Sequence, residues 1–473
     1  MPLFLSVFMK KLIGKREFYA TVIALALPLL LQNAISTFVN LLDNLMVGRI
    51  GTESMSGVSI VNQILFVYNL CLFGGTGGAG IFGAQFHGRG DHEGVRSTFR
   101  FNFMLCMGFT ALAALVFSAA PEALIGAFLH ETDRTADLAR TLAEGRAYMR
   151  IMLLGLPAFA LTTAYVSILR VTGDNRLPMR ASVTAIFVNL VFNYILIYGR
   201  LGFPALGVRG AAVATVLSRY VELTLILLGT HGKKEPPAFL RGAYSSMRIP
   251  AALTKDIIRR GLPLLCNEMF WSLGMTMLTQ CYSYRGLDAI AALNIANTVS
   301  HLFMTVMFTL GNVVGIILGN LLGAEDFDKA KEYCPQLLFL GFASCAVMGL
   351  VLFIAAPAAP RLYNTSPHIM ELAAGLMRVS AVFMPVMAVT NCAYWALRAG
   401  GRTYITMAFD SVFTWVAAVP IAWLLIHLTD WGLLRVYFMV NAADLIKLTI
   451  GLWLLHKGVW VNNIVADKSA AGA

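Results

Sequence analysis

Charged residues are scarce in this chain, at 13% of 473 residues, whereas roughly a quarter is usual in soluble domains. Hydrophobic residues make up 58% of the sequence. This composition argues against a soluble globular protein and predicts a chain that lies in a bilayer. At about 35 to 40 residues for each helix and its loop, the length predicts close to twelve membrane-spanning helices.

Cysteine is also sparse, and its seven copies lie in or beside apolar runs, without CxxC spacing or a neighbouring histidine. We interpret them as small core residues, not as a disulfide framework or a zinc site. The N-terminus lacks the small-residue cleavage pattern of a signal peptide, so we expect the first apolar segment to remain in the protein.

The net charge of +11 does not indicate a nucleic-acid partner, because the basic residues are expected in short loops and not on one amphipathic face. Alternate loops are predicted to be rich in basic residues such as Arg96, Arg100 and Arg170, and the intervening loops are poorer. This positive-inside bias predicts a multi-pass protein of the cytoplasmic membrane with both termini in the cytoplasm.

Two short motifs that occur in enzymes are present in unsuitable contexts. Gly75, Gly77 and Gly80 spell GxGxxG, but no strand precedes them, so close helix packing is the better interpretation. The GxGD string at residues 88–91 matches intramembrane aspartyl proteases, which need this Asp and a second one inside membrane helices. Here it is expected in a charged loop, so we predict that the protein is not an enzyme.

The first predicted helix contains the most informative polar residues. Residues 18–42 carry no charge and are long enough to cross a bilayer, and Pro28 is expected to kink the helix. Asp43 follows, with Gln32 and Asn33 on preceding turns. An acid at membrane depth is a functional-site hypothesis because desolvation disfavours its charge. From position alone, Asp43 is as well explained as a marker of the membrane interface.

A second polar group is expected in the fifth and sixth spans. Asn189 and Asn193 are four residues apart and therefore share one helix face, and Thr215 lies on a small-residue face of the next span. Two interpretations remain open at this point: a polar site within the membrane, or hydrogen bonds that join neighbouring helices.

The second half of the sequence repeats the first. Pro263 aligns with Pro28 at an offset of 235 residues, the difference between 263 and 28, and Pro385 aligns with Pro157 at an offset of 228. Each half therefore holds six spans, an even number, and the halves are parallel repeats. Such repeats are typical of transporters, in which they rock around a central cavity. All four prolines are expected to kink their helices.

The repeat also fixes the predicted segments. They are a cytoplasmic N-terminal segment 1–17, an N-terminal six-helix lobe 18–230, a cytoplasmic linker 231–252, a C-terminal six-helix lobe 253–456 and a cytoplasmic tail 457–473.

Comparison of the halves reveals further acids. Glu268 aligns with Asn33, and Asp410 lies in the eleventh predicted span. Asp444 and Lys447, three residues apart, are predicted to pair as Arg219 and Glu222 do. We therefore expect Glu268 and Asp410, with Asp43, to be the functional intramembrane acids.

The chain resembles the multidrug and toxic compound extrusion family over about residues 17–457. The resemblance rests on three stretches: LLDNLMVGRIGTESMSGVS, ILRVTGDNRLPMRASVTAIFVNLVFNYILIYGRLGFPALGVRGAAVAT and ALRAGGRTYITMAFDSVFTWVAAVPIAW. It implies an all-α polytopic fold of twelve helices in two six-helix lobes that form a V. It also implies export of organic cations in exchange for sodium ions or protons.

The resemblance assigns roles residue by residue. Asp43 matches the family's coupling Asp of the first helix, and three positions match its polar site or a sodium site with it: Asn189, Asn193 and Thr215. Glu268 matches a Glu of the branch that couples in the C-terminal lobe. That branch also uses an Asp where this chain offers only Met387 or Asn391.

These observations predict an antiporter with Asp43 as its main coupling carboxylate. Its expected partners are small organic cations and membrane lipids, and it needs no cofactor beyond the coupling ion, H⁺ or Na⁺. We expect a monomer. Two alternatives remain: a flippase of lipid-linked sugars from the same superfamily, which would need arginines in its cavity, and a channel, for which no filter motif is present.

Overall fold

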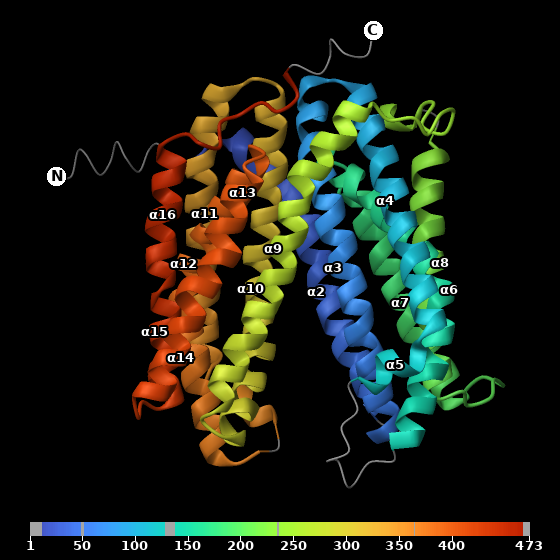
Figure 1. The fold of residues 1–473 in the computed structure, drawn as a ribbon, viewed down its shortest axis with the longest axis vertical. Coiled ribbons are helices and arrows are strands. Elements are labelled where there is room, and N and C mark those ends of the chain that lie inside the picture. Colours follow the sequence, from blue (N-terminus) through green and yellow to red (C-terminus); the bar gives the residue numbers. More distant parts are fainter. Residues whose placement is uncertain (1–11, 49–51, 128–137, 234–235, 364, 467–473) are drawn as a thin grey trace. The chain divides into compact units, whose positions relative to one another are not determined.

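The protein is described by a computed structural model that covers residues 12–48, 52–127, 138–233, 236–363 and 365–466. Within these ranges, the side chains at positions 38, 40–45, 47–48, 52–55, 138 and 287 lie outside the description. The described residues form helices and no strands (Figure 1).

The helices of the first half follow one another with short connections. They are α2 (Arg16–Gly48), α3 (Thr52–Arg89), α4 (His92–Ala119), α5 (Pro121–Gly126), α6 (Leu138–Val171), α7 (Arg176–Tyr198) and α8 (Val208–His231).

The second half begins after the short 3₁₀ turn η1 (Ala238–Leu240). Its elements are α9 (Ala251–Ser283), α10 (Leu287–Gly323), α11 (Phe327–Ala355), η2 (Ala359–Leu362), α12 (Pro367–Ala399), α13 (Thr403–Met407), η3 (Ala408–Val412), η4 (Thr414–Ala418), α14 (Val419–Leu428), α15 (Leu433–Ala442) and α16 (Asp444–His456).

Eleven described helical segments are long and apolar enough to cross a bilayer. α9 is the twelfth long helix, and its 33 residues exceed the roughly 20 that a span requires. It is more polar than the others because its first turns carry charges such as Asp256, Arg259 and Arg260. The expected multi-pass all-α architecture is confirmed.

The helix bounds confirm the internal repeat. α2 and α9 both have 33 residues, and α9 begins and ends 235 positions after α2. α10 and α11 also begin 235 positions after α3 and α4. The offset falls to 228 at the ends of α6 and α12 and to 225 at the ends of α8 and α16, so the halves differ by a second shift that the sequence comparison had not separated.

The prolines used to align the halves lie inside continuous helices. Pro28, Pro157, Pro263 and Pro385 fall within α2, α6, α9 and α12, each of which continues past its proline. Their role as kinks stays a prediction.

The chain divides into two compact units, each with its own buried core. One unit comprises residues 1–30, 84–91 and 256–473, and the other comprises residues 31–83 and 92–255. In the first unit α12 packs against α10, α11 and α16; in the second, α8 packs against α6 and α7. All seven cysteines are free, and five of them are buried, as the sequence predicted. The exact lobe boundaries stay a prediction.

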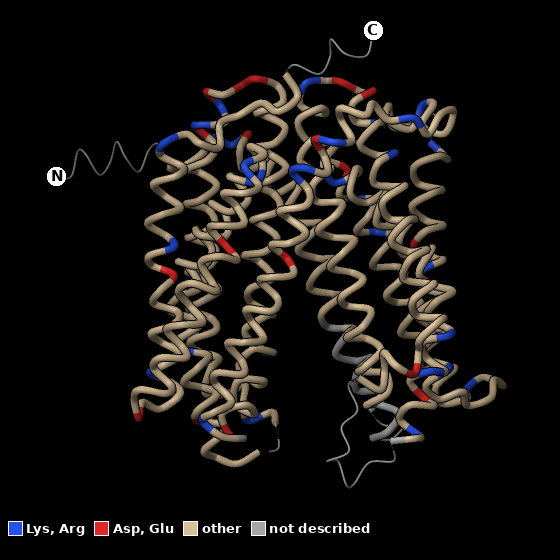
Figure 2. The backbone as a smooth tube through the Cα atoms, viewed as in Figure 1, with Lys and Arg blue, Asp and Glu red and all other residues tan. Residues whose placement is uncertain are grey.

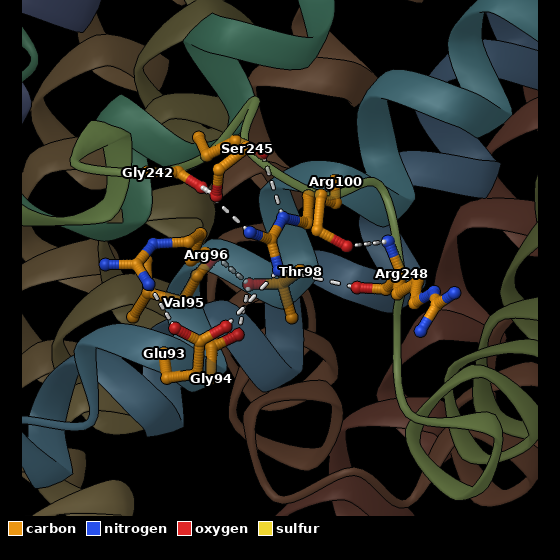
Figure 3. A network of polar contacts seen from close by, with 11 residues as sticks. Glu93, Gly94, Val95, Arg96, Thr98, Arg100, Gly242, Ser245 and Arg248 are labelled. Atoms are coloured by element: carbon orange, nitrogen blue, oxygen red, sulfur yellow. Dashed lines mark hydrogen bonds and ion pairs between the residues drawn. The ribbon is translucent and has the colours of Figure 1, made fainter.

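The linker between the halves is anchored on α4 by Arg100, which is only 6% exposed (Figure 3). Its guanidinium donates to the carbonyl oxygens of Gly242 and Ala243, both at 2.9 Å, and also contacts Glu93 at 3.3 Å.

The prediction that Arg96, Arg100 and Arg170 lie in loops is wrong. α4 and α6 extend beyond their apolar stretches and include these residues.

Within the unit that contains residues 84–91, α3 and α10 cross with their backbones in contact. A Cβ atom on Gly88 would lie 1.9 Å from the carbonyl oxygen of Asn320, and one on Gly323 would lie 1.9 Å from that of Gln85. These two contacts are equivalent by the 235-residue repeat. Only glycine permits this approach, which is how small residues bring membrane helices together.

The C-terminal segment is fastened beside this crossing. The Gln85 side chain is fully buried; its Nε2 donates to the carbonyl oxygens of Ala399 (2.9 Å) and Asn462 (3.1 Å), and its Oε1 accepts from the Ile464 amide (2.8 Å). Trp460 is 2% exposed. The part of the predicted tail that the structure describes is therefore packed against α3 and α12.

We expect Gly88→Ala to destabilise the protein, because the new Cβ atom would overlap the backbone of Asn320, which cannot move away by a change of rotamer as a side chain could. Overpacking of this kind costs about 1–3 kcal/mol or more. The thermal unfolding midpoint of the purified protein in detergent would measure this loss.

Gly80→Ala, in the same helix, is the matched control, since no heavy atom lies within 4 Å of its Cβ position. It should leave the midpoint unchanged or raise it slightly, because alanine favours helix. Equal effects of the two substitutions would contradict the close crossing.

Candidate functional site

Four charged side chains from four helical segments gather in the unit that contains α9 to α16. They are Glu268 of α9, Arg398 of α12, Asp410 of η3 and Lys447 of α16, and we call them the charge cluster. Their side chains are between 5% and 18% exposed. Figure 2 shows that most other charged residues lie near the ends of the helices.

The charge cluster consists of two pairs of opposite charge. Lys447 Nζ donates to Asp410 Oδ1 at 2.6 Å, whereas Arg398 Nη1 lies 3.8 Å from Glu268 Oε1. The first pair is a direct charge-assisted hydrogen bond, and the second is a longer ionic contact. Lys447 therefore contacts Asp410 and not Asp444, with which the sequence had paired it, because Asp410 approaches from another helix.

Two neutral side chains join the pairs into one network. Asn267, which is 1% exposed, donates from Nδ2 towards Asp410 Oδ2 at 3.2 Å and the Tyr394 hydroxyl at 3.3 Å. Arg398 donates to the same hydroxyl at 3.2 Å. The two carboxylates are therefore connected by contacts through Asn267, Tyr394 and Arg398.

The helix that carries Asp410 departs from α-helical geometry at this point. η3 and η4 are π-helical segments, which place an extra residue in a turn and are frequent at functional sites. Ser411 Oγ lies 2.6 Å from Asn267 Oδ1, so the π-helical segment is tied to α9. Aromatic rings support both cations: Lys447 lies 5.3 Å from the ring of Phe409, and Arg398 lies 4.6 Å from that of Trp395.

The first half contains a related arrangement at equivalent positions. Arg170 and Gln32 correspond to Arg398 and Asn267, and Arg170 Nη2 lies 3.4 Å from Gln32 Oε1. Glu222 corresponds to Lys447 but has the opposite charge. It pairs with Arg219 at 3.1 Å, as the sequence predicted, and also attracts Arg170.

The amide and hydroxyl groups predicted in the first half meet in the structure. Asn193 Nδ2 donates to Asn189 Oδ1 at 3.1 Å, and Asn189 Nδ2 donates to Thr215 Oγ1 at 3.3 Å. Asn193 and Asn189 are 2% and 7% exposed. Their oxygens are hard ligands suited to Na⁺ or to a proton-carrying group. The Asp43 side chain lies outside the described residues, so its membership of this site stays a prediction.

The remaining predicted residues lie elsewhere. The Asn33 carbonyl oxygen accepts from Thr37 Oγ1 at 2.9 Å. Asn391 Oδ1 packs against Gly311 of α10, at 2.1 Å from its Cβ position. Among the described residues, Asn391 makes no hydrogen bond with the charge cluster.

Sequence reasoning missed three residues of this network, Asn267, Tyr394 and Arg398, and also the contact of Lys447 with Asp410. The alignment of Leu397-Arg398 with Leu169-Arg170 was the signal that could have revealed the buried arginines. It places both arginines in the last turn of a long helix, where α6 and α12 carry them.

Comparison with known proteins matches both halves of the chain. The family model MatE matches residues 28–195 and 263–424, two segments whose starts are 235 residues apart. A probable multidrug resistance protein NorM of Thermotoga maritima is 25% identical over 455 residues, covering 96% of this chain and 95% of that protein. A probable multidrug resistance protein YoeA of Bacillus subtilis is 24% identical and covers 92% of each chain.

Solved structures share the fold. An outward-facing multidrug resistance MATE transporter of the MOP superfamily has a TM-score of 0.83 at 21% identity, covering 96% of this chain and 98% of that chain. A MOP superfamily transporter of Pyrococcus furiosus, whose binding pocket is described as having reverse polarity, has a TM-score of 0.80 at 20% identity, with the same coverage.

We expect Lys447→Met to destabilise the protein by about 2–4 kcal/mol, because it leaves Asp410 charged and without its closest partner among membrane helices. The Lys447→Met/Asp410→Asn double variant should recover at least half of that loss, since both charges are then absent. Thermal unfolding in detergent measures both changes.

Lys331→Met, on the exposed surface of α11, is the control and should change stability by less than about 0.5 kcal/mol. The pairing of Lys447 with Asp410 would be refuted if the destabilisation of the double variant equalled the sum of the destabilisations caused by Lys447→Met and by Asp410→Asn alone.

Proposed function

Because this chain belongs to the MatE family, and because the proteins similar to it are transporters and not enzymes, we propose that it exports small organic cations in exchange for H⁺ or Na⁺. The multidrug resistance names of the NorM and YoeA relatives support drug-like substrates. The proposed location is the cytoplasmic membrane, with both termini in the cytoplasm, and the proposed active form is a monomer.

The observation that carries the proposal is the pairing of each membrane-embedded acid of the charge cluster with a cation of the protein itself. A carboxylate that holds an internal cation is able to exchange it for an external one. Asp410 is 18% exposed and Glu268 is 16% exposed, so both retain some access from outside the protein. Of the two, Glu268 is held by the longer contact and is the more readily exchanged.

Exchange follows from competition for the same charge. A cationic substrate and a coupling ion cannot both neutralise one carboxylate, so binding of one favours release of the other. Protonation of Asp410, or Na⁺ at that site, would remove the partner of Lys447 and loosen the Asn267 network. In parallel repeats this local change is transmitted when the halves rock against one another.

In the first half, Asp43 is proposed as the main coupling carboxylate. Asn189, Asn193 and Thr215 supply oxygen atoms for the same ion, in the chain of hydrogen bonds described above. In a one-for-one exchange of monovalent cations no net charge moves, so the concentration gradient of the coupling ion supplies the energy. A tenfold ion gradient, worth about 1.4 kcal/mol, supports a substrate gradient of about tenfold.

Polyspecific binding is proposed to use flexible apolar side chains of α9 and α10. Met269, Phe270 and Met275 are between 44% and 50% exposed, whereas Met307 is only 5% exposed and is unsuited to substrate contact. Methionine and aromatic surfaces adapt to different organic cations.

A flippase for lipid-linked sugars is the second candidate. One observation favours it: Arg170 and Arg398 lie within long helices, where a phosphate would need them. Against it, Arg398 already faces Glu268, and Arg170 is attracted by Glu222, so neither presents an uncompensated charge.

The decisive experiment measures efflux of a cationic dye from proteoliposomes with proton and sodium gradients imposed separately. We expect one gradient to drive saturable efflux and Asp43→Asn to lower its rate by about tenfold or more, a loss of at least about 1.4 kcal/mol. Asp328→Asn, which removes an exposed carboxylate at the start of α11, should be unaffected.

Undiminished ion-driven efflux by Asp43→Asn would remove this residue from the mechanism. Translocation of a lipid-linked sugar without dye efflux would favour the flippase, and ungated conductance would favour a channel.

We further expect Glu268→Gln to lower coupled efflux at least threefold and to flatten its pH dependence, because the group that exchanges its partner can no longer ionise. Its repeat counterpart Asn33 supplies the matched control: Asn33→Gln should leave the pH profile in place. A Glu268→Gln profile identical to that of the parent protein would show that Glu268 does not take part in coupling.

A further inference from the structure

A cavity of about 300 Å³ lies between the first turns of α9 and the start of α13, away from the residues assigned above. It is lined from α9 by Asp256, Arg259 and Arg260, and from the other side by Arg402, which directly precedes α13, and by Tyr404 of its first turn. All of these residues belong to the same compact unit.

Positive charge dominates this cavity, since three guanidinium groups face one carboxylate. Asp256 attracts Arg260, whereas Arg259 and Arg402 repel it. Among the described residues, neither Arg259 nor Arg402 takes part in an ion pair, and both are exposed. Crowding of like charges is unfavourable, and an anion bound among them would relieve the repulsion.

Two of the arginines are held in position by the backbone. Arg260 Nη1 donates to the Gly401 carbonyl oxygen at 2.7 Å, and Arg402 Nε donates to that of Val459 at 3.1 Å. A guanidinium has five N–H donors, so each side chain keeps several for a ligand. The fork geometry of these donors fits phosphate oxygens.

The surroundings indicate where such a phosphate would come from. Tyr404 is 60% exposed beside the arginines, at the end of an apolar span. Aromatic residues in this position sit at the level of lipid headgroups, and basic pockets between membrane helices bind the phosphates of anionic lipids.

We propose that this cavity binds the phosphate of an anionic membrane lipid, with Arg259, Arg260 and Arg402 as its ligands and Tyr404 against the glycerol region. The lipid phosphate joins the first turns of α9 to the start of α13.

The site lies at the start of α9 and of the continuous segment α13–η3, which also carry Glu268 and Asp410 of the charge cluster. Asn267 follows Arg260 by seven residues, and Asp410 follows Thr403 by seven. Each interval is about two helical turns, or roughly 10 Å along the axis. The Asn267–Asp410 hydrogen bond therefore joins deeper turns of the segments whose ends the lipid would hold together. Lipid binding is nevertheless measurable without any assumption about transport.

The test titrates the purified full-length protein in neutral detergent with dioleoylphosphatidylglycerol and follows the thermal unfolding midpoint, which a ligand of the native state raises. We expect the parent protein to be stabilised, and Arg259→Gln/Arg402→Gln to need about tenfold more lipid for half of the effect, since two charge-assisted contacts are lost. Dioleoylphosphatidylcholine, which has no net charge, should have little effect.

Arg176→Gln/Arg180→Gln is the matched control, because it removes two exposed arginines from the first turns of α7. Its half-saturating lipid concentration should stay within twofold of that of the parent protein. Should Arg259→Gln/Arg402→Gln fail to fold, Arg259→Lys/Arg402→Lys decides, and we expect it to need about threefold more lipid because lysine loses the bidentate geometry.

Three results would overturn the proposal. The first is an unchanged half-saturating concentration in the variant that carries the substitutions in the cavity. The second is equal stabilisation by the two lipids. The third is stabilisation by inorganic phosphate alone to the level reached with dioleoylphosphatidylglycerol, which would identify a site for free anions.

Discussion

The hydrogen bond between Lys447 and Asp410 is the interaction on which the candidate site depends. A carboxylate among membrane helices is costly unless a cation or a donor compensates it, and here Lys447 does so at 2.6 Å. The same carboxylate holds Asn267, which in turn contacts Tyr394 and the π-helical segment. Under the proposed exchange, an ion that replaced Lys447 at Asp410 would therefore alter this whole network.

The duplicated halves use the same positions for different charges. Gln32 and Arg170 in the first half become Asn267 and Arg398 in the second, and Glu222 becomes Lys447. The two halves therefore keep the positions at which polar groups meet, whereas the charge at one position is reversed, from Glu222 to Lys447. The first half has hydrogen-bonded side-chain amides and the second has ion pairs, and these two arrangements are suited to different ligands. Such a difference is compatible with the exchange of two different cations.

The ends of the helices are organised by the backbone as much as by side chains. Gly88 and Gly323 allow α3 and α10 to touch, and Gln85 fastens the C-terminal segment to the end of α12. In the same unit the arginines beside α13 bond to backbone carbonyl groups. These contacts hold the ends of α3, α10 and α12 and the C-terminal segment together within this unit.

The sequence by itself determined the class of fold, because twelve apolar segments and a register of 235 residues admit few arrangements other than two repeated helical bundles. It also located Asp410, Glu268 and the Asn189–Asn193 pair, since polar residues are conspicuous in apolar helices. Only the tertiary structure decided which groups meet: Lys447 is three residues from Asp444 in sequence yet bonds Asp410, 37 positions away. Partner choice depends on packing between helices and on the π-helical turn, and neither leaves a periodic signal in a single sequence.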